Sequence, residues 1–106
     1  MKYLIVDDHA LITSALSMML IDRDPAAAVL TAETAEGAID LVRREGDTAD
    51  LLILDLSMPG VTGTELMEEI VRIQPMLKIL VVSGLVDQQS IMRVLQLGAA
   101  GFDIEL

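Results

Sequence analysis

The residue with the clearest chemical potential in this chain is Asp55, which follows the apolar run Leu51 to Leu54 and precedes Pro59, Gly60 and Gly63. A short apolar run that ends in turn residues is typical of a strand buried on both faces of a parallel sheet. An acid at the end of such a strand lies at the carboxyl edge of the sheet, where open α/β folds bind their ligands. We therefore interpret Asp55 as a nucleophile for phosphoryl transfer. Taken alone, the residue also fits a solvated loop acid.

Polar residues end the other apolar runs as well. Asp7 and Asp8 follow the first run, Ser83 follows the fourth, and Glu105 stands at the end of the last. If these runs are parallel strands, their ends meet in one crevice, and carboxylates gathered there repel one another. The single histidine, His9, adjoins the acids and is assigned a surface or packing role.

An all-oxygen ligand set without a His or Cys cluster suits a hard cation, Mg²⁺ before Zn²⁺. Such an ion takes one or two carboxylates together with phosphate oxygens, while a neighbouring carboxylate can form an acyl phosphate. Ser83 could donate its hydroxyl to a phosphate oxygen. Each feature alone is weak, because an Asp-Asp pair or a Ser-Gly pair after a strand is ordinary turn chemistry.

Strand and helix patterns alternate along the whole chain, and this alternation predicts an α/β fold with a doubly wound, five-stranded parallel sheet and helices on both faces. The predicted strands are 3–6, 29–32, 51–55, 78–82 and 101–105. The predicted helices are 10–21, 35–45 with Thr34 as N-cap, 64–73 and 87–97. The apolar residues of the first helix, Met58 in the loop and the other methionines at helical spacing are expected to fill the core.

Composition excludes several classes of function. The chain has 106 residues, 53% of them hydrophobic, and a formal net charge of −10, which argues for one globular domain and against binding of nucleic acid or of an anionic membrane surface. It has no cysteine, so disulfides, thiolate zinc sites and thiol catalysis are excluded. No signal peptide or membrane-spanning run is found, and a cytoplasmic location is expected.

Four motifs together carry a resemblance to a known family: IVDDH, LLILDLSMPGVTG, VVSG and LGAAGF. On these motifs the entire chain, residues 1–106, resembles the receiver domain of bacterial two-component response regulators. The VDDHALI opening and the GAAGF ending are most similar to the subfamily with a LuxR-type helix-turn-helix output domain. The resemblance implies a flavodoxin-like fold with strand order 2-1-3-4-5.

The resemblance also implies a role for each site residue. Asp55 would be the phospho-acceptor, and Asp7 and Asp8 the acidic pair, with Asp8 the more direct metal ligand. The backbone carbonyl of Ser57 would complete a Mg²⁺ site together with Asp55. Two further residues would act in the switch: Ser83 by its contact with the phosphate, and Phe102 by turning inward.

The chain departs from the family pattern in two places. The family carries a lysine where this chain has Glu105. An ion pair between such a lysine and a phosphoryl group at about 4 Å is worth roughly 4 kcal/mol at an effective dielectric near 20, and Glu105 reverses the sign of this interaction. Either Glu105 points away, or phosphorylation is weak or absent, or the extra carboxylate holds the metal more tightly. The family also continues into a fifth helix beyond Leu106. We therefore expect either a truncated or altered form, or a second copy of the chain that covers the gap.

Three hypotheses for the function follow. The first is a receiver, not an enzyme in its own right, that takes phosphate from a sensor histidine kinase and reaches DNA only through an output domain outside this chain. The second is a pseudo-receiver that binds partners without phosphate, which Glu105 favours. The third, an aspartate-nucleophile phosphatase, is disfavoured because position 57 is Ser and not Asp. Nucleotide-binding glycine motifs are absent.

Overall fold

The computed structural model describes residues 1–56, 58, 63–82 and 101–103. The strands are β1 (Lys2–Val6), β2 (Ala28–Ala32), β3 (Leu51–Asp55), β4 (Ile79–Val82) and β5 (Gly101–Asp103), and the helices are α1 (Ala10–Arg23), α2 (Ala35–Glu45) and α3 (Gly63–Ile73). The strands pair in parallel in the order β2-β1-β3-β4-β5. This confirms the α/β, flavodoxin-like architecture. The helix predicted over 87–97 lies outside the described residues.

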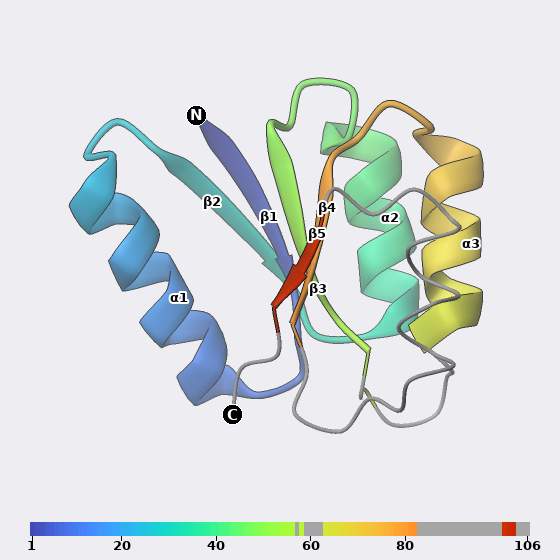
Figure 1. Ribbon diagram of the computed structural model, residues 1–106, viewed down its shortest axis with the longest axis horizontal. Coiled ribbons are helices and arrows are strands. Elements are labelled where there is room, and N and C mark those ends of the chain that lie inside the picture. Colours follow the sequence, from blue (N-terminus) through green and yellow to red (C-terminus); the bar gives the residue numbers. More distant parts are fainter. Residues whose placement is uncertain (57, 59–62, 83–100, 104–106) are drawn as a thin grey trace.

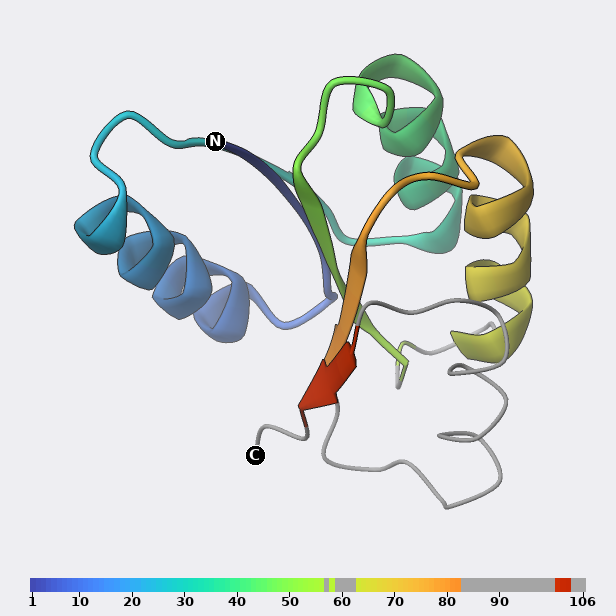
Figure 2. The ribbon, with the colours of Figure 1, turned by 45° about the horizontal axis from the view of Figure 1, so that its top comes forward.

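Helices cover the sheet unequally on its two faces. Of the three described helices, Figure 1 shows α1 on one face and α2 with α3 on the other, and Figure 2 shows the same layers after a turn of 45°. Because side chains alternate along a strand, each strand contributes side chains to both faces of the sheet. Within the described part of the chain, no helix has the length and apolar content needed to cross a membrane.

The main core lies between the sheet and helices α2 and α3. It contains alternate residues of the central strands, among them Leu4 and Val6 of β1 and Leu52 and Leu54 of β3, which pack against buried residues of both helices. Met67 of α3 is fully buried, and so is Ala38 of α2. At the start of α2, Thr34 caps the helix as predicted, because its hydroxyl oxygen accepts a hydrogen bond from Gly37 N at 3.0 Å.

The second core, beneath α1, is small. Ile5 and Ile53 are its buried members, and from α1 only Leu16 and Leu20 pack against them, both partly exposed. None of the 14 residues of α1 is buried. Its exposed large apolar side chains are Leu11, Ile12, Met18, Met19 and Ile21.

The prediction that the apolar residues and methionines of the first helix fill the core is therefore wrong for most of them. Met18 is 72% exposed and Met19 is 54% exposed. The physical reason is that one straight helix lying on a twisted sheet buries only a narrow stripe, here Leu16 and Leu20, unless another element covers its flanks. The same prediction is confirmed for Met67, and Met58 is also buried, as expected.

Candidate functional site

Asp7 and Asp55 lie side by side at the carboxyl edge of the sheet. Strand β1 pairs with β3 in the register Val6 to Leu54, so the next residue on each strand is an aspartate. The backbone stays aligned beyond β1, since Asp7 N donates to the carbonyl oxygen of Ala32 at 3.1 Å. Alternation places both aspartates on the α1 face, the face of Ile5 and Ile53. Both are buried, with exposed fractions of 3% for Asp7 and 4% for Asp55.

Asp8 and His9 form the connection from β1 to α1. Asp7 Oδ1 accepts hydrogen bonds from the backbone N of His9 at 2.8 Å and makes a 2.9 Å contact with the ring Nδ1 of the same residue. His9 is the N-cap of α1, and Thr13 N donates to its carbonyl oxygen at 3.0 Å. The connection is thus held by the strand end on one side and by the first turn of the helix on the other.

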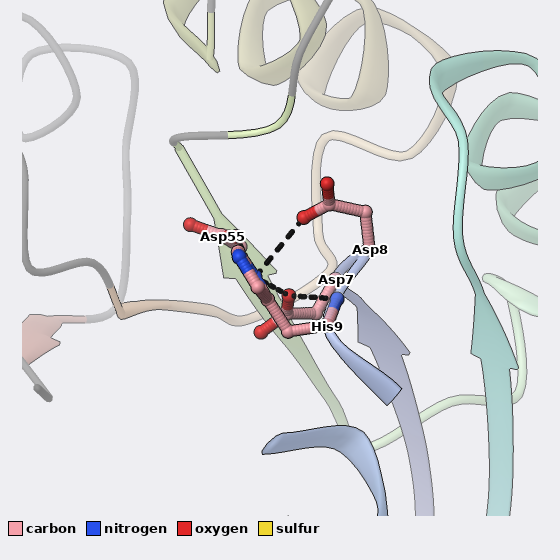
Figure 3. Close-up of side chains that lie close together, drawn as sticks. All are labelled: Asp7, Asp8, His9 and Asp55. Atoms are coloured by element: carbon pink, nitrogen blue, oxygen red, sulfur yellow. Dashed lines mark hydrogen bonds and ion pairs between the residues drawn. The ribbon is translucent and has the colours of Figure 1, made fainter. Parts of the chain in front are cut away.

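The His9 ring points toward three carboxylates. Its Nδ1 lies 2.9 Å from Asp7 Oδ1, 3.1 Å from Asp8 Oδ1 and 3.7 Å from Asp55 Oδ2. Figure 3 shows these four side chains gathered at the strand ends, with dashed lines from the ring to its partners. The hydrogen bond to Asp7 and the charge of Asp8 raise the pKa of His9 above its ordinary value of 6.5, and partial burial of the ring opposes them.

One oxygen of Asp8 lacks a hydrogen bond although it is buried. Asp8 Oδ1 lies within ion-pair distance of the His9 ring but has no hydrogen-bond partner. A ring nitrogen carries at most one proton, so Nδ1 can donate one well-directed hydrogen bond, and its contact with Asp7 is the shorter of the two. A buried oxygen without a donor is costly, and a cation would satisfy it.

The donor set fits a divalent cation. One ligand atom from each of Asp7, Asp8, His9 and Asp55 lies within 4.8 Å of the other three. Three of these atoms are carboxylate oxygens, which Mg²⁺ prefers. The predicted convergence of Asp7, Asp8 and Asp55 at one place is thus present in the structure, while their roles stay predictions.

The structure leaves several predicted site residues undescribed. Ser57, Ser83 and Glu105 lie outside the described residues. The backbone of Phe102 lies in β5, where it pairs with Val81, but its side chain is not described. The expectations for these four residues therefore stay as stated.

His9 is the site residue that sequence reasoning assigned differently. Its exposed fraction of 55% agrees with a surface position, yet its ring contacts the acids. The available signal was its position directly after two aspartates at a strand end, where a short connection leaves the side chain little choice of direction.

Comparison with known proteins identifies the family. The family model "Response regulator receiver domain" matches residues 3–102. The chain belongs to the response regulator receiver domains. This match covers the residues of the candidate site and agrees with the fold and with the acidic cluster at the strand ends.

This receiver domain is similar to parts of longer proteins. It is 34% identical over 101 residues to the response regulator GacA of Pseudomonas aeruginosa, covering 95% of this chain and 46% of GacA. It is 39% identical over 103 residues to a protein-glutamate methylesterase/protein-glutamine glutaminase of Cupriavidus metallidurans, covering 95% of this chain and 28% of that protein. The chain thus spans less than half the length of either relative.

A solved structure shows a similar fold. The two-component response regulator of the LuxR family from Aurantimonas superposes with a TM-score of 0.79 at 29% identity, covering 97% of this chain and 72% of that chain.

Proposed function

We propose that this receiver domain accepts a phosphoryl group on Asp55 from a phosphohistidine of a sensor histidine kinase, in a reaction that depends on Mg²⁺. The observation that carries the proposal is the cluster of the buried Asp55 carboxylate with Asp7 and Asp8, all within reach of one ion. Three carboxylates held this closely repel one another when no cation is present, which destabilises the folded protein. The same cluster is suited to binding a metal ion and, through the ion, a phosphoryl group.

The chemistry is an in-line displacement at phosphorus. A carboxylate oxygen of Asp55 attacks the phosphorus, the P–N bond of the phosphohistidine breaks, and its electron pair leaves with the imidazole, so that an acyl phosphate forms on Asp55. Asp7, Asp8, Asp55 and the backbone carbonyl of Ser57 would hold the Mg²⁺. When bound, the ion neutralises charge on the phosphoryl oxygens.

Phosphorylation of Asp55 then changes a surface of the domain that binds other parts of the regulator. Ser83 contacts the new phosphoryl group, and Phe102 turns inward in response, as the family resemblance implies. The surface then controls an output domain outside this chain. Transcription control through a LuxR-type, DNA-binding output domain is supported by the motifs VDDHALI and GAAGF and by the LuxR-family structure of similar fold. The methylesterase relative shows that receiver domains also occur in proteins with other activities.

Labelling with acetyl phosphate tests the proposal. With Mg²⁺ present, the wild type should gain the mass of one phosphoryl group, and peptide mapping should place it on Asp55. The variant Asp55→Asn should gain none. Asp47→Asn, which makes the same charge change at an exposed position outside the cluster, serves as the control and should be labelled like the wild type. Absence of label on the wild type with Mg²⁺ would contradict the proposal.

One observation favours a second candidate function, a pseudo-receiver that binds partners without phosphate. Glu105 stands where the family has a lysine, so this position supplies no cation to pair with the phosphoryl group. Beryllofluoride discriminates the two functions. A receiver should show NMR shifts around Asp55 on addition of beryllofluoride with Mg²⁺, and a pseudo-receiver should show none.

Self-association is the remaining partner hypothesis. A second copy of the chain would cover the exposed apolar residues of α1, of which Leu11 and Met18 are 86% and 72% exposed. Light scattering after gel filtration should then give a dimer whose fraction falls with dilution and with Met18→Lys. A monomer at all concentrations would contradict this hypothesis.

A further inference from the structure

His9 introduces a nitrogen donor into an otherwise all-oxygen cluster. Its Nδ1 is the ring atom that faces the acids, at 2.9 and 3.1 Å from one oxygen each of Asp7 and Asp8. A hydrogen bond and an octahedral coordination edge have almost the same length, because two neighbouring ligands at about 2.1 Å from an ion lie about 3.0 Å apart. The distances from Nδ1 to these oxygens therefore also fit a shared ion, to which the ring would have to turn.

The backbone around His9 supports this placement. Its N–H is fixed to Asp7 Oδ1 and its carbonyl oxygen accepts from Thr13 N, so both sides of the residue are held. The ring itself is half-exposed, and its approach to the cluster therefore costs little desolvation. To bind an ion, Nδ1 must give up its proton, which passes to solvent from the charged ring or is carried on Nε2 in the neutral ring. As a neutral ligand, the imidazole then adds a donor without adding a further negative charge to three carboxylates.

We propose that His9 Nδ1 is a direct ligand of the divalent ion bound by Asp7, Asp8 and Asp55, and that it shifts the preference of the site from Mg²⁺ toward ions that accept nitrogen ligands, such as Mn²⁺. Imidazole is a good ligand for transition metals such as Zn²⁺ and Ni²⁺, whereas carboxylates and water suit Mg²⁺ and Mn²⁺. As a transition-metal ion, Mn²⁺ still accepts an imidazole ligand more readily than Mg²⁺ does. The inference rests on the proposed metal-dependent receiver function. The alternative, in which the ring occupies the place of the cation and must leave when an ion binds, is an outcome of the test.

Because His9 is the only histidine in the chain, one isotope label reports on this residue alone. Chain without an affinity tag is loaded with Mn²⁺, and electron spin-echo envelope modulation detects nitrogen bonded to the ion. The wild type should show this coupling. Histidine labelled with nitrogen-15 in the ring should change its frequencies, and His9→Asn should abolish it.

Affinities supply the second readout. Titrations of the wild type and of His9→Asn with Mn²⁺ alone and with Mg²⁺ alone give the ratio of the two affinities. Loss of outer-shell groups already lowers metal affinity by about 10–100-fold, so loss of a direct ligand should lower the Mn²⁺ affinity by at least about tenfold. Mg²⁺ affinity should change much less, and the Mn²⁺ to Mg²⁺ ratio should fall accordingly. Asp47→Asn is the control and should leave both affinities unchanged.

Three results would overturn the inference: Mn²⁺ bound to the wild type without nitrogen coupling, an unchanged ratio in His9→Asn, or tighter Mg²⁺ binding by that variant, which would show that the ring competes with the ion. Acetyl phosphate labelling of the wild type with Mg²⁺ separates the two proposals. Label on Asp55 without nitrogen coupling leaves the receiver function standing and removes only the role of His9. If the wild type neither binds metal nor becomes labelled, both the receiver function and the role of His9 are wrong.

Discussion

At the scale of single residues, the site is a group of like charges placed together by the backbone. Asp7 and Asp55 occupy neighbouring positions on two adjacent strands and are buried on the same face. Asp8 adds a third carboxylate, and one of its oxygens has no donor. The His9 ring offsets only part of this charge, since one imidazole faces three carboxylates, with Nδ1 at 2.9, 3.1 and 3.7 Å from Asp7, Asp8 and Asp55. Like charges held this closely destabilise the protein when no cation is present, whereas the proposed metal site requires them.

This conflict predicts opposite effects of one substitution on stability and on metal binding. Asp8→Asn removes a charge from the cluster, so we expect the metal-free protein to become more stable by about 1 kcal/mol. The same change removes a ligand and should lower Mg²⁺ affinity at least about tenfold. Urea denaturation without metal and calorimetric titration with Mg²⁺ measure the two effects. Asp47→Asn should change neither, and a less stable Asp8→Asn protein would contradict the prediction.

At the scale of elements, α2 is tied to the start of β1 by a contact between Lys2 and Glu45. The Lys2 ammonium group pairs with the Glu45 carboxylate and also donates to Thr48 Oγ1 at 2.6 Å. The hydrogen bond to Lys2 is the main cause that lowers the pKa of Glu45 below its ordinary value of 4.5. The contact joins residues 43 positions apart in the sequence.

The lowered pKa predicts a pH dependence of the free energy of unfolding. A carboxyl group with a depressed pKa in the folded state contributes stability above its unfolded pKa and loses it as the pH falls through the folded value. The wild type should therefore be more stable than Glu45→Gln at about pH 7, and the two should become equal at acidic pH below the folded pKa. Thermal unfolding at both pH values checks this. If the stability difference between the wild type and Glu45→Gln is the same at both pH values, it comes from packing and not from the charge of Glu45.

Helix α3 holds the main core through Met67, while Met76 follows the helix on the surface. Met67 is fully buried and Met76 is 91% exposed. Met67→Ala should lower the free energy of unfolding by about 2–5 kcal/mol, because it removes buried side-chain atoms and leaves a cavity. Met76→Ala deletes the same atoms at an exposed position and should change the free energy by less than about 0.5 kcal/mol. Equal effects in chemical denaturation would contradict the assignment of the core.

At the scale of the whole molecule, the two faces of the sheet differ in how firmly they hold their helices. Helices α2 and α3 share one continuous core with the sheet, whereas α1 rests on the sheet through Leu16 and Leu20. Figure 2 shows α1 separate from the pair α2 and α3. Since His9 is the N-cap of α1, the less firmly held helix is also the one directly joined to the candidate site.

This asymmetry predicts an order of local opening. Amides of α1 should exchange with solvent faster than amides of α2 in native-state hydrogen exchange, because few buried apolar contacts hold α1. Binding of Mg²⁺ to Asp7 and Asp8 should slow exchange in the first turn of α1, since the ion would fix the connection that leads into this helix. Exchange in α1 as slow as in α2 before metal is added would contradict the prediction.

The sequence by itself determined the fold class and the convergence of three acids at one edge of the sheet. Apolar runs that end in acids are visible without coordinates, and the rule that parallel strands end at one edge brings Asp7, Asp8 and Asp55 together. Thr34 as N-cap and Met58 and Met67 as core residues follow from local chemistry and periodicity, and the structure agrees. These features depend on neighbours close in the sequence or on the strand pattern alone.

Only the tertiary structure decided which apolar residues of α1 are buried and where the His9 ring lies. Leu11, Met18 and Met19 are apolar residues in a helix, like residues that fill a core. Whether they are buried depends on whether another element packs over them, and the helical pattern of the sequence does not contain this information. The direction of His9 depends on the distance between two strand ends and the start of α1. The position of His9 directly after two aspartates is a sequence signal for its direction, but the distances that bring its ring to the acids arise from packing.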